Sequence, residues 1–170
     1  MYFHIFAFSH QVSMSTCVLC LSIHRYYVHP SGVNAIRFFP VYGHLLLSGS
    51  LDSTVKIWDV HGKRKCLRSY LGHTGAVRDV QFSHDGKSFL STSYDKFIKL
   101  WDTETGKCVA RWTTGKIPFC ATWHGDPERA NEFLTGMQNK KICQWDARTP
   151  SVEAPTQECV TWFGLCCFIL

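Results

Sequence analysis

The side chains that are able to perform chemistry in this sequence include two sets of serine, histidine and aspartate. The sets, which have nearly the same internal spacing, are His29, Ser48 and Asp52, and His73, Ser91 and Asp95. A serine activated by histidine and oriented by aspartate is the arrangement of serine hydrolases. A catalytic triad is expected once in a domain, however, whereas these residues recur together along the chain. We therefore interpret both sets as repeated structural elements and predict that the protein is not an enzyme.

The chain also carries nine cysteines, and thiolates are common zinc ligands. Cys17 and Cys20 form one Cys-x-x-Cys pair, but no second pair follows at the spacing of a zinc site. The odd count without a regular framework also argues against a secreted disulfide scaffold. The interior cysteines are predicted to be small buried residues on strands: Cys66, Cys108, Cys120 and Cys143. No metal or other cofactor is predicted, and a metal or redox protein using the His- and Cys-rich ends is the alternative hypothesis.

The serine, histidine and aspartate sets belong to a sequence repeat. Trp58, Trp101 and Trp145 are separated by 43 and 44 residues. Two further sets keep a fixed distance from the tryptophans: Asp52, Asp95 and Asn139 lie six residues before them, and Ser48, Ser91 and Thr135 lie ten residues before them. A period in the low forties with a recurring Trp-Asp pair is typical of one four-stranded blade per repeat.

Each repeat contains four short segments of alternating or β-branched apolar residues, separated by turn-forming residues. In the second copy the predicted strands are 77–82, 88–93, 97–102 and 108–113. The corresponding strands of the first copy are "VNAIRFF", "HLLLSGS", "TVKIWD" and "KCLRSY". No segment has the periodicity of an amphipathic helix. The fold class is therefore predicted to be all-β.

The sequence resembles the WD-repeat family through "GH" at 72–73 and "WD" at 58–59, 101–102 and 145–146. The resemblance implies a β-propeller fragment of about three four-stranded blades, open rather than closed, from a seven-bladed parent ring. It also implies a buried hydrogen-bond network of Trp, Ser or Thr, His and Asp in each blade. In the third repeat, Thr114 replaces the histidine and Asn139 the aspartate, so that network is expected to be incomplete. The implied network residues are His29, Ser48, Asp52, Trp58, His73, Ser91, Asp95, Trp101, Thr135, Asn139 and Trp145.

Composition divides the chain into three parts. Residues 1–24 and 159–170 contain no Asp, Glu, Lys or Arg, although 18% of the whole chain is charged. We expect a non-domain segment at 1–28, three repeats over 29–149 (about 29–70, 71–113 and 114–149), and a non-family tail at 150–170. The hypothesis is a truncated or mis-spliced product whose ends derive from non-coding sequence. The outer strand of the third blade would come from the segment containing Pro155, so we expect that blade to be frayed.

The resemblance implies a protein-interaction scaffold rather than a catalyst. By the geometry of the family, the candidate partner-binding top face comprises Asn34, Leu51, Arg78, Tyr94, Phe119 and Gln138. The segments "KIPFC" and "NKKICQWD" are similar to a branch of the family that acts at the second catalytic step of pre-mRNA splicing. The implied partners are spliceosomal proteins in the nucleus, with RNA contacted only indirectly, no membrane and no small-molecule substrate. The alternative within the same fold is another adaptor, such as a ubiquitin-ligase substrate receptor.

Overall fold

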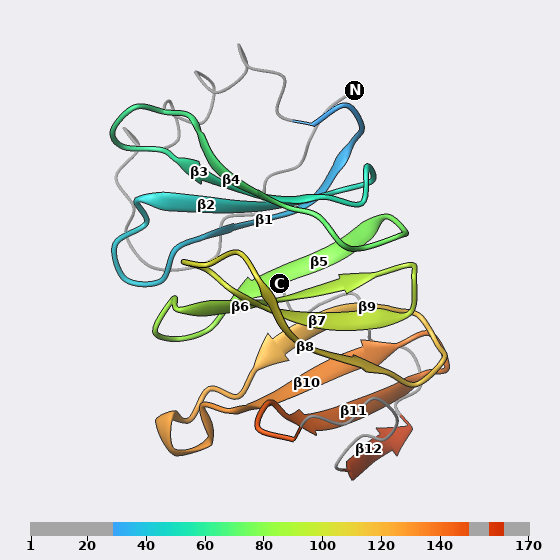
Figure 1. Cartoon of the computed structure of the whole chain (residues 1–170). Coiled ribbons are helices and arrows are strands. Elements are labelled where there is room, and N and C mark those ends of the chain that lie inside the picture. Colours follow the sequence, from blue (N-terminus) through green and yellow to red (C-terminus); the bar gives the residue numbers. More distant parts are fainter. Residues whose placement is uncertain (1–28, 150–156, 162–170) are drawn as a thin grey trace.

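The computed structural model describes residues 29–149 and 157–161, which form three four-stranded antiparallel sheets (Figure 1). We call these sheets blade one (β1–β4), blade two (β5–β8) and blade three (β9–β12). Their strands are β1 Val33–Phe38, β2 Leu45–Ser50, β3 Val55–Asp59, β4 Cys66–Tyr70, β5 Val77–Phe82, β6 Ser88–Ser93, β7 Phe97–Asp102, β8 Cys108–Thr113, β9 Pro118–Trp123, β10 Glu132–Met137, β11 Lys141–Asp146 and β12 Gln157–Thr161. One short 3₁₀ helix, η2 (Pro127–Arg129), lies between β9 and β10.

Within every blade the strands pair in chain order, as expected when hairpin turns join neighbouring strands. The four strands predicted for the second repeat coincide with β5 to β8. The all-β prediction is confirmed, because strands and turns dominate the described residues. Blade three is more complete than expected, since β12 begins two residues beyond Pro155 and pairs with β11 from Lys141 to Gln144. The proline therefore lies outside the ladder and does not interrupt it.

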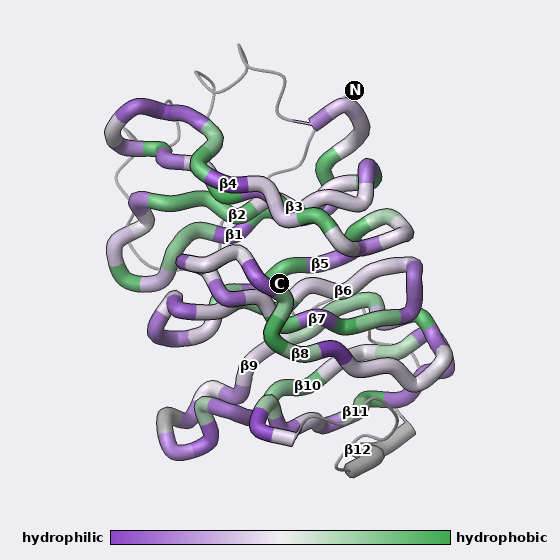
Figure 2. The backbone as a smooth tube through the Cα atoms, viewed as in Figure 1, coloured by the Kyte–Doolittle hydropathy of each residue, from purple (hydrophilic) through white to green (hydrophobic). Residues whose placement is uncertain are grey.

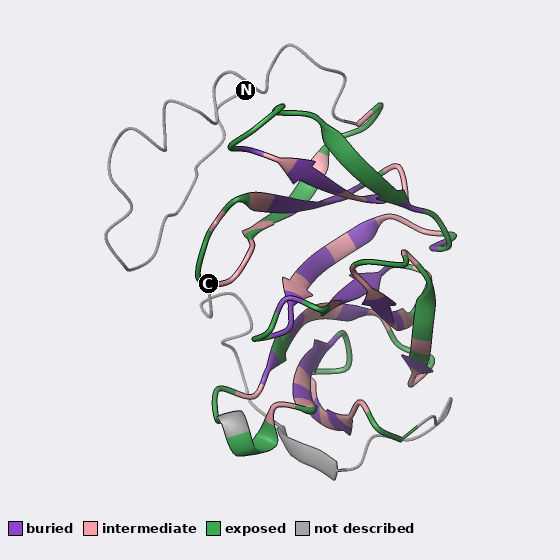
Figure 3. Cartoon of the chain, turned by 60° about the vertical axis from the view of Figure 1, so that its left-hand side comes forward, coloured by how far each residue is buried: buried purple, intermediate pink, exposed green. Residues whose placement is uncertain are grey.

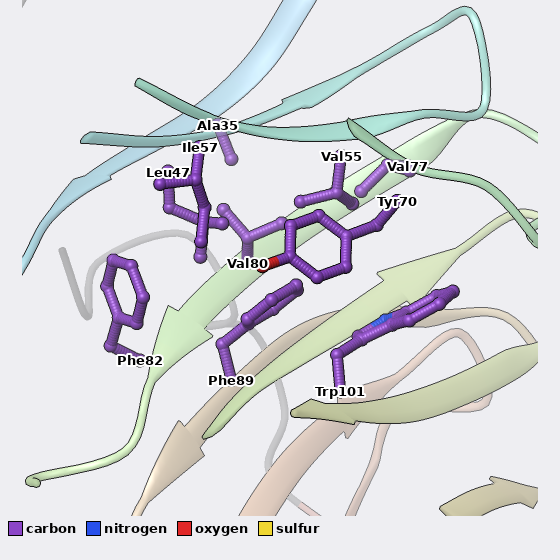
Figure 4. Close-up of a cluster of buried hydrophobic side chains, with 10 residues drawn as sticks. All are labelled: Ala35, Leu47, Val55, Ile57, Tyr70, Val77, Val80, Phe82, Phe89 and Trp101. Atoms are coloured by element: carbon purple, nitrogen blue, oxygen red, sulfur yellow. The ribbon is translucent and has the colours of Figure 1, made fainter. Parts of the chain in front are cut away.

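The blades stack face to face, and two hydrophobic cores fill the spaces between them. The core between blades one and two contains Leu47, Ile57, Val80, Phe89 and Trp101, all at most 3% exposed (Figure 4). The second core, between blades two and three, is made in the same way from residues of β6 to β11. Burial of one such Leu or Phe side chain contributes about 2 kcal/mol, so these cores hold the stack together.

Hydropathy and burial follow this arrangement. Figure 2 shows hydrophobic residues concentrated along the strands and hydrophilic residues in the turns. Most buried residues lie between the sheets, whereas the outer strands β4 and β8 are largely exposed (Figure 3). The prediction of buried cysteines is therefore wrong for Cys66 and Cys108, which open the outer strands β4 and β8 and are exposed. Of the other two, Cys120 is half-buried and Cys143 is buried.

The described sheets form an open stack and do not close a ring (Figure 1). Each blade has the same two edges, one at its inner strand (β1, β5 or β9) and one at its outer strand. On the face of blade one that packs against no other described blade, Leu46 and Trp58 are nevertheless only 6% and 4% exposed and form a small cluster with Val60. In the part of the chain that the structure describes, no helix is long and apolar enough to cross a membrane.

Candidate protein-interaction face

In blade two, four side chains from separate elements form one buried hydrogen-bond network. Trp101 on β7 donates its indole N–H to Ser91 Oγ on β6 over 2.8 Å. The Ser91 hydroxyl lies 2.7 Å from His73 Nε2, and His73 Nδ1 lies 2.7 Å from Asp95 Oδ2. An ionised carboxylate only accepts hydrogen bonds, so His73 donates to Asp95 through Nδ1. The network fixes the segment before β5 to the turn between β6 and β7.

Blade one repeats this geometry. Trp58 donates to Ser48 Oγ over 2.9 Å, His29 Nε2 lies 2.9 Å from the same oxygen, and His29 Nδ1 lies 2.8 Å from Asp52 Oδ2. Burial lowers the pKa of His29, although the neighbouring carboxylate of Asp52 opposes that effect. The imidazole is therefore neutral near pH 7, which leaves Nε2 able to accept from the Ser48 hydroxyl.

The acidic residue of each network also shapes the turn that follows it. Asp52 Oδ1 accepts from the backbone N–H of Thr54, and Asp95 Oδ1 accepts from that of Phe97. The intervening Ser53 and Lys96 adopt φ values of 66° and 70°, in the left-handed region that most residues avoid. The carboxylate thus stabilises a strained turn while it orients the histidine.

Blade three keeps only part of the network. Trp145 donates to Thr135 Oγ1 over 2.8 Å, and Asn139 Oδ1 accepts from the backbone N–H of Lys141 over 3.3 Å. Thr114 stands where the other blades have histidine, and its buried hydroxyl has no hydrogen-bond partner among the described residues. Asn139 therefore retains the turn-capping role but lacks the histidine that an aspartate would orient.

The Ser-His-Asp sets do not have the surroundings of a hydrolase site. A nucleophilic serine needs an open side at which substrate binds, but Ser48 and Ser91 are 1% and 0% exposed. Each hydroxyl oxygen already accepts from a tryptophan. Across residues 29–149 and β12, no group of three or more His, Cys, Asp or Glu is placed to hold a metal ion. Cys17 and Cys20 lie outside the described residues.

The predicted top-face residues occupy equivalent positions at one end of the stack. Asn34, Arg78 and Phe119 are the second residues of the inner strands β1, β5 and β9. The other three residues follow β2, β6 and β10. Each donates its backbone N–H to the carbonyl of the residue immediately before an inner strand: Leu51 to Gly32, Tyr94 to Ala76 and Gln138 to Ile117. Since the start of each inner strand pairs with the end of its neighbour, all six lie on one end face.

Arg78 contacts Tyr94 and Phe119, and these three top-face residues form a cluster that spans blades two and three. Its guanidinium lies 5.5 Å from the Tyr94 ring centre and 5.2 Å from that of Phe119, and Nη1 is 3.3 Å from the Tyr94 hydroxyl. Cation–π contacts of this kind restrict the arginine before any partner arrives. Tyr94 is 43% exposed, so its ring is accessible at the surface. We call Arg78, Tyr94 and Phe119 the arginine–aromatic cluster.

The remaining top-face residues have different surroundings. Asn34 donates Nδ2–H to the Val77 carbonyl over 2.7 Å, so its amide ties blade one to blade two. Leu51 is 49% exposed, and Gln138 is also exposed. The face therefore combines one ordered cationic and aromatic cluster with an exposed leucine on the neighbouring blade.

Sequence reasoning missed an ion pair between blades one and two whose acidic member also accepts a hydrogen bond from blade three. Arg37 Nη2 on β1 lies 3.1 Å from Asp79 Oδ1 on β5, and Asp79 Oδ2 accepts from the backbone N–H of Ala121 on β9 over 3.3 Å. Burial raises the pKa of Asp79, although Arg37 opposes that effect. Asp79 on the inward-facing side of the strand "VRDVQF" was the available signal, but its partners become visible only in the stack.

Comparison with protein families supports the repeat interpretation. The family described as "WD domain, G-beta repeat" matches residues 13–59 and 64–102. The β-propeller domain of Cps50 (Swd1) from Myceliophteria thermophila superimposes with a TM-score of 0.65 at 24% identity, covering 72% of this chain and 38% of that one. The structural likeness establishes the fold alone.

The sequence is also similar to proteins named pre-mRNA-processing factor 17. It is 49% identical over 130 residues to pre-mRNA-processing factor 17 of Homo sapiens, covering 76% of this chain and 22% of that protein. The Saccharomyces cerevisiae protein of the same name is 42% identical over 126 residues, covering 74% of this chain and 27% of its own length. The chain thus spans about a quarter of the length of these relatives.

Proposed function

The chain belongs to the WD-repeat family, and from that premise we propose that its blades form a non-enzymatic platform on which proteins of the splicing machinery dock. The observation that carries this proposal is the 49% identity to human pre-mRNA-processing factor 17, which extends over 76% of this chain. The earlier resemblance, through "KIPFC" and "NKKICQWD", adds the second catalytic step of splicing and a nuclear location to the proposal. RNA would be reached only through the protein assembly.

The top face supports protein docking because it presents an ordered arginine and an exposed aromatic side chain. Arg and Tyr are enriched among residues that dominate the energy of protein interfaces. The contacts of Arg78 with the Tyr94 and Phe119 rings reduce the conformational entropy that binding would otherwise remove. Leu51 adds an exposed apolar contact on the adjacent blade. We therefore infer that the arginine–aromatic cluster is the centre of the docking face.

The test is retention of the tagged chain on purified spliceosomal complexes. We expect the unmodified chain to co-sediment with them and the Arg78→Ala/Tyr94→Ala variant to bind at least about 10-fold more weakly, as for loss of two interface hot spots. The matched control is Arg111→Ala/Phe97→Ala, which removes a similar cation–π pair at 5.7 Å. Its binding should be unchanged.

Three results would contradict the proposal. Equal loss in both variants would show a general effect on folding rather than a docking face. Retention by a ubiquitin ligase instead of spliceosomal complexes would favour the substrate-receptor alternative. Stoichiometric metal in the purified chain, lost on replacement of Cys17 and Cys20, would favour the metal-protein alternative.

A further inference from the structure

The exposed charge at the top end of the described stack is positive. The segments that form this end precede the inner strands or follow β2, β6 and β10: 29–32, 51–54, 71–76, 94–96, 114–117 and 138–140. Together with the start of β5 they carry four basic residues: Arg78, Lys96, Lys116 and Lys140. The acidic residues of these segments are Asp52 and Asp95. Their side chains are only 8% and 4% exposed, because each binds the histidine of its network.

The opposite end of the stack has mixed charge. Its turns carry exposed acidic residues at Asp85, Glu104, Asp126 and Glu128. Exposed basic residues lie in the same turns, and one of them, Lys87, is 3.9 Å from Asp85. The positive character of the top end is therefore a local feature and does not follow from the net charge of +5 alone.

Arg78 has no acidic partner of its own among the described residues. Arg37 and Arg78 are both half-buried, but only Arg37 pairs with Asp79. Arg78 donates a hydrogen bond from Nη1 to the Tyr94 hydroxyl, and its Nε is buried without a partner. Asp79 is close enough to interact with the charge of Arg78, yet its oxygens bind Arg37 and the backbone N–H of Ala121. The guanidinium is thus partly desolvated without an acceptor to compensate for that loss.

We propose that the partner segment docking on the top face is acidic, and that one of its carboxylates binds the guanidinium of Arg78. This inference rests on the proposed docking function and adds the chemistry of the partner. A guanidinium and a carboxylate form two parallel charge-assisted hydrogen bonds, which would supply the acceptors that Arg78 lacks. The contacts with the Tyr94 and Phe119 rings hold the guanidinium in place. Exposed Lys96 and Lys116, in the turns on either side, would attract further carboxylates of the same segment.

The same observations favour an acidic peptide over single-stranded RNA. Proteins that bind single strands present aromatic rings on which successive bases stack. Both rings of the arginine–aromatic cluster already contact the guanidinium of Arg78. The top-end segments contain no Phe, Tyr or Trp besides Tyr94. The surface therefore offers cations for carboxylates but no row of rings for bases.

The probe is a fluorescein-labelled decapeptide of alternating Glu and Gly, whose binding to the unmodified chain is measured by fluorescence anisotropy. A matched neutral peptide has Gln in place of every Glu. We expect the Glu peptide to bind at least about 10-fold more tightly than the Gln peptide, as for one interface hot spot. Arg78→Gln should abolish this preference, whereas Arg78→Lys, which keeps the charge but not the planar fork, should retain part of it.

Two lysine variants test the surrounding charge without altering the cluster. Lys96→Gln/Lys116→Gln should weaken binding of the Glu peptide about 3-fold, as expected for exposed ion pairs. Lys87→Gln/Lys107→Gln is the matched control, because it removes two exposed lysines from the opposite end. Its affinity for both peptides should equal that of the unmodified chain. The urea unfolding midpoint of every variant should match that of the unmodified chain, which separates loss of the site from loss of the fold.

Three results would overturn the proposal. The first is equal binding of the Glu and Gln peptides, and the second is an equal loss of Glu-peptide binding in the two lysine variants. The third is tighter binding of an oligonucleotide of ten uridines than of the Glu peptide, with loss of that binding in Arg78→Gln. This third result would assign the face to nucleic acid.

The inference and the proposed function fail in different ways. If Arg78→Ala/Tyr94→Ala weakens binding to spliceosomal complexes but excess Glu peptide does not displace the unmodified chain from them, the docking face stands and its acidic chemistry is wrong. If the Glu peptide binds through Arg78 but no spliceosomal complex retains the chain, the acidic chemistry stands and the proposed partner is wrong.

Discussion

Replacing Asp95 tests whether the negative charge of this residue allows the buried network to stabilise the fold. Burial by itself would raise the pKa of Asp95, but hydrogen bonding and charge attraction from His73, with backbone N–H groups of Phe97 and Thr74, hold that pKa at about 2 instead of 3.8. One pKa unit corresponds to about 1.4 kcal/mol, so ionised Asp95 contributes roughly 2 kcal/mol to the free energy of unfolding. The Asp95→Asn variant should lose this amount at pH 7.

The sign of the pH dependence follows from the lowered pKa. A carboxylate with a lower pKa in the folded state stabilises the protein fully above its unfolded pKa, and this stabilisation disappears as pH falls through the folded value. The difference in unfolding free energy between the unmodified chain and Asp95→Asn should therefore be constant above about pH 5 and shrink toward zero near pH 2.

Urea unfolding followed by circular dichroism at a series of pH values measures this difference. Glu104→Gln is the charge-matched control, because Glu104 is exposed in the turn between β7 and β8. It should change the unfolding free energy by no more than about 0.5 kcal/mol. A difference between the unmodified chain and Asp95→Asn that stays the same from pH 6 to pH 2 would refute the argument that the charge of Asp95 stabilises the fold.

Two further predictions concern contacts between and within blades. Arg37→Ala should lower the unfolding free energy by about 2 kcal/mol at pH 7, because Asp79 is left buried without its cation. Because burial raises the pKa of Asp79, the loss should shrink as pH falls and Asp79 is protonated; urea unfolding that shows an equal loss at low pH would contradict this account. Gly75→Ala should cost about 2 kcal/mol or more, since an added Cβ would lie 2.8 Å from the backbone nitrogen of Asp95. Gly125→Ala, with no atom within 4 Å of the added Cβ, should change thermal stability little, and similar losses in the two variants would count against a steric origin.

Local sequence determined the strands and turns of this protein. Alternating apolar residues set β5 to β8 at their observed bounds, and the repeat spacing of Trp101, Ser91 and Asp95 indicated side chains that the structure joins by hydrogen bonds. These features are readable because strand alternation and turn chemistry depend on neighbours within a few residues. The repeat then makes each local signal appear more than once.

Tertiary structure alone decided which of these residues are covered. Phe38 and Phe82 occupy equivalent positions in equivalent strands, yet Phe38 is 49% exposed and Phe82 is 6% exposed, because among the described blades one packs against Phe82 and none against Phe38. The pairing of Arg37 with Asp79 also depends on β1 and β5 lying side by side, 42 residues apart in the chain. Burial is a property of the neighbouring sheet, and the sequence of one strand contains no information about which sheet that will be.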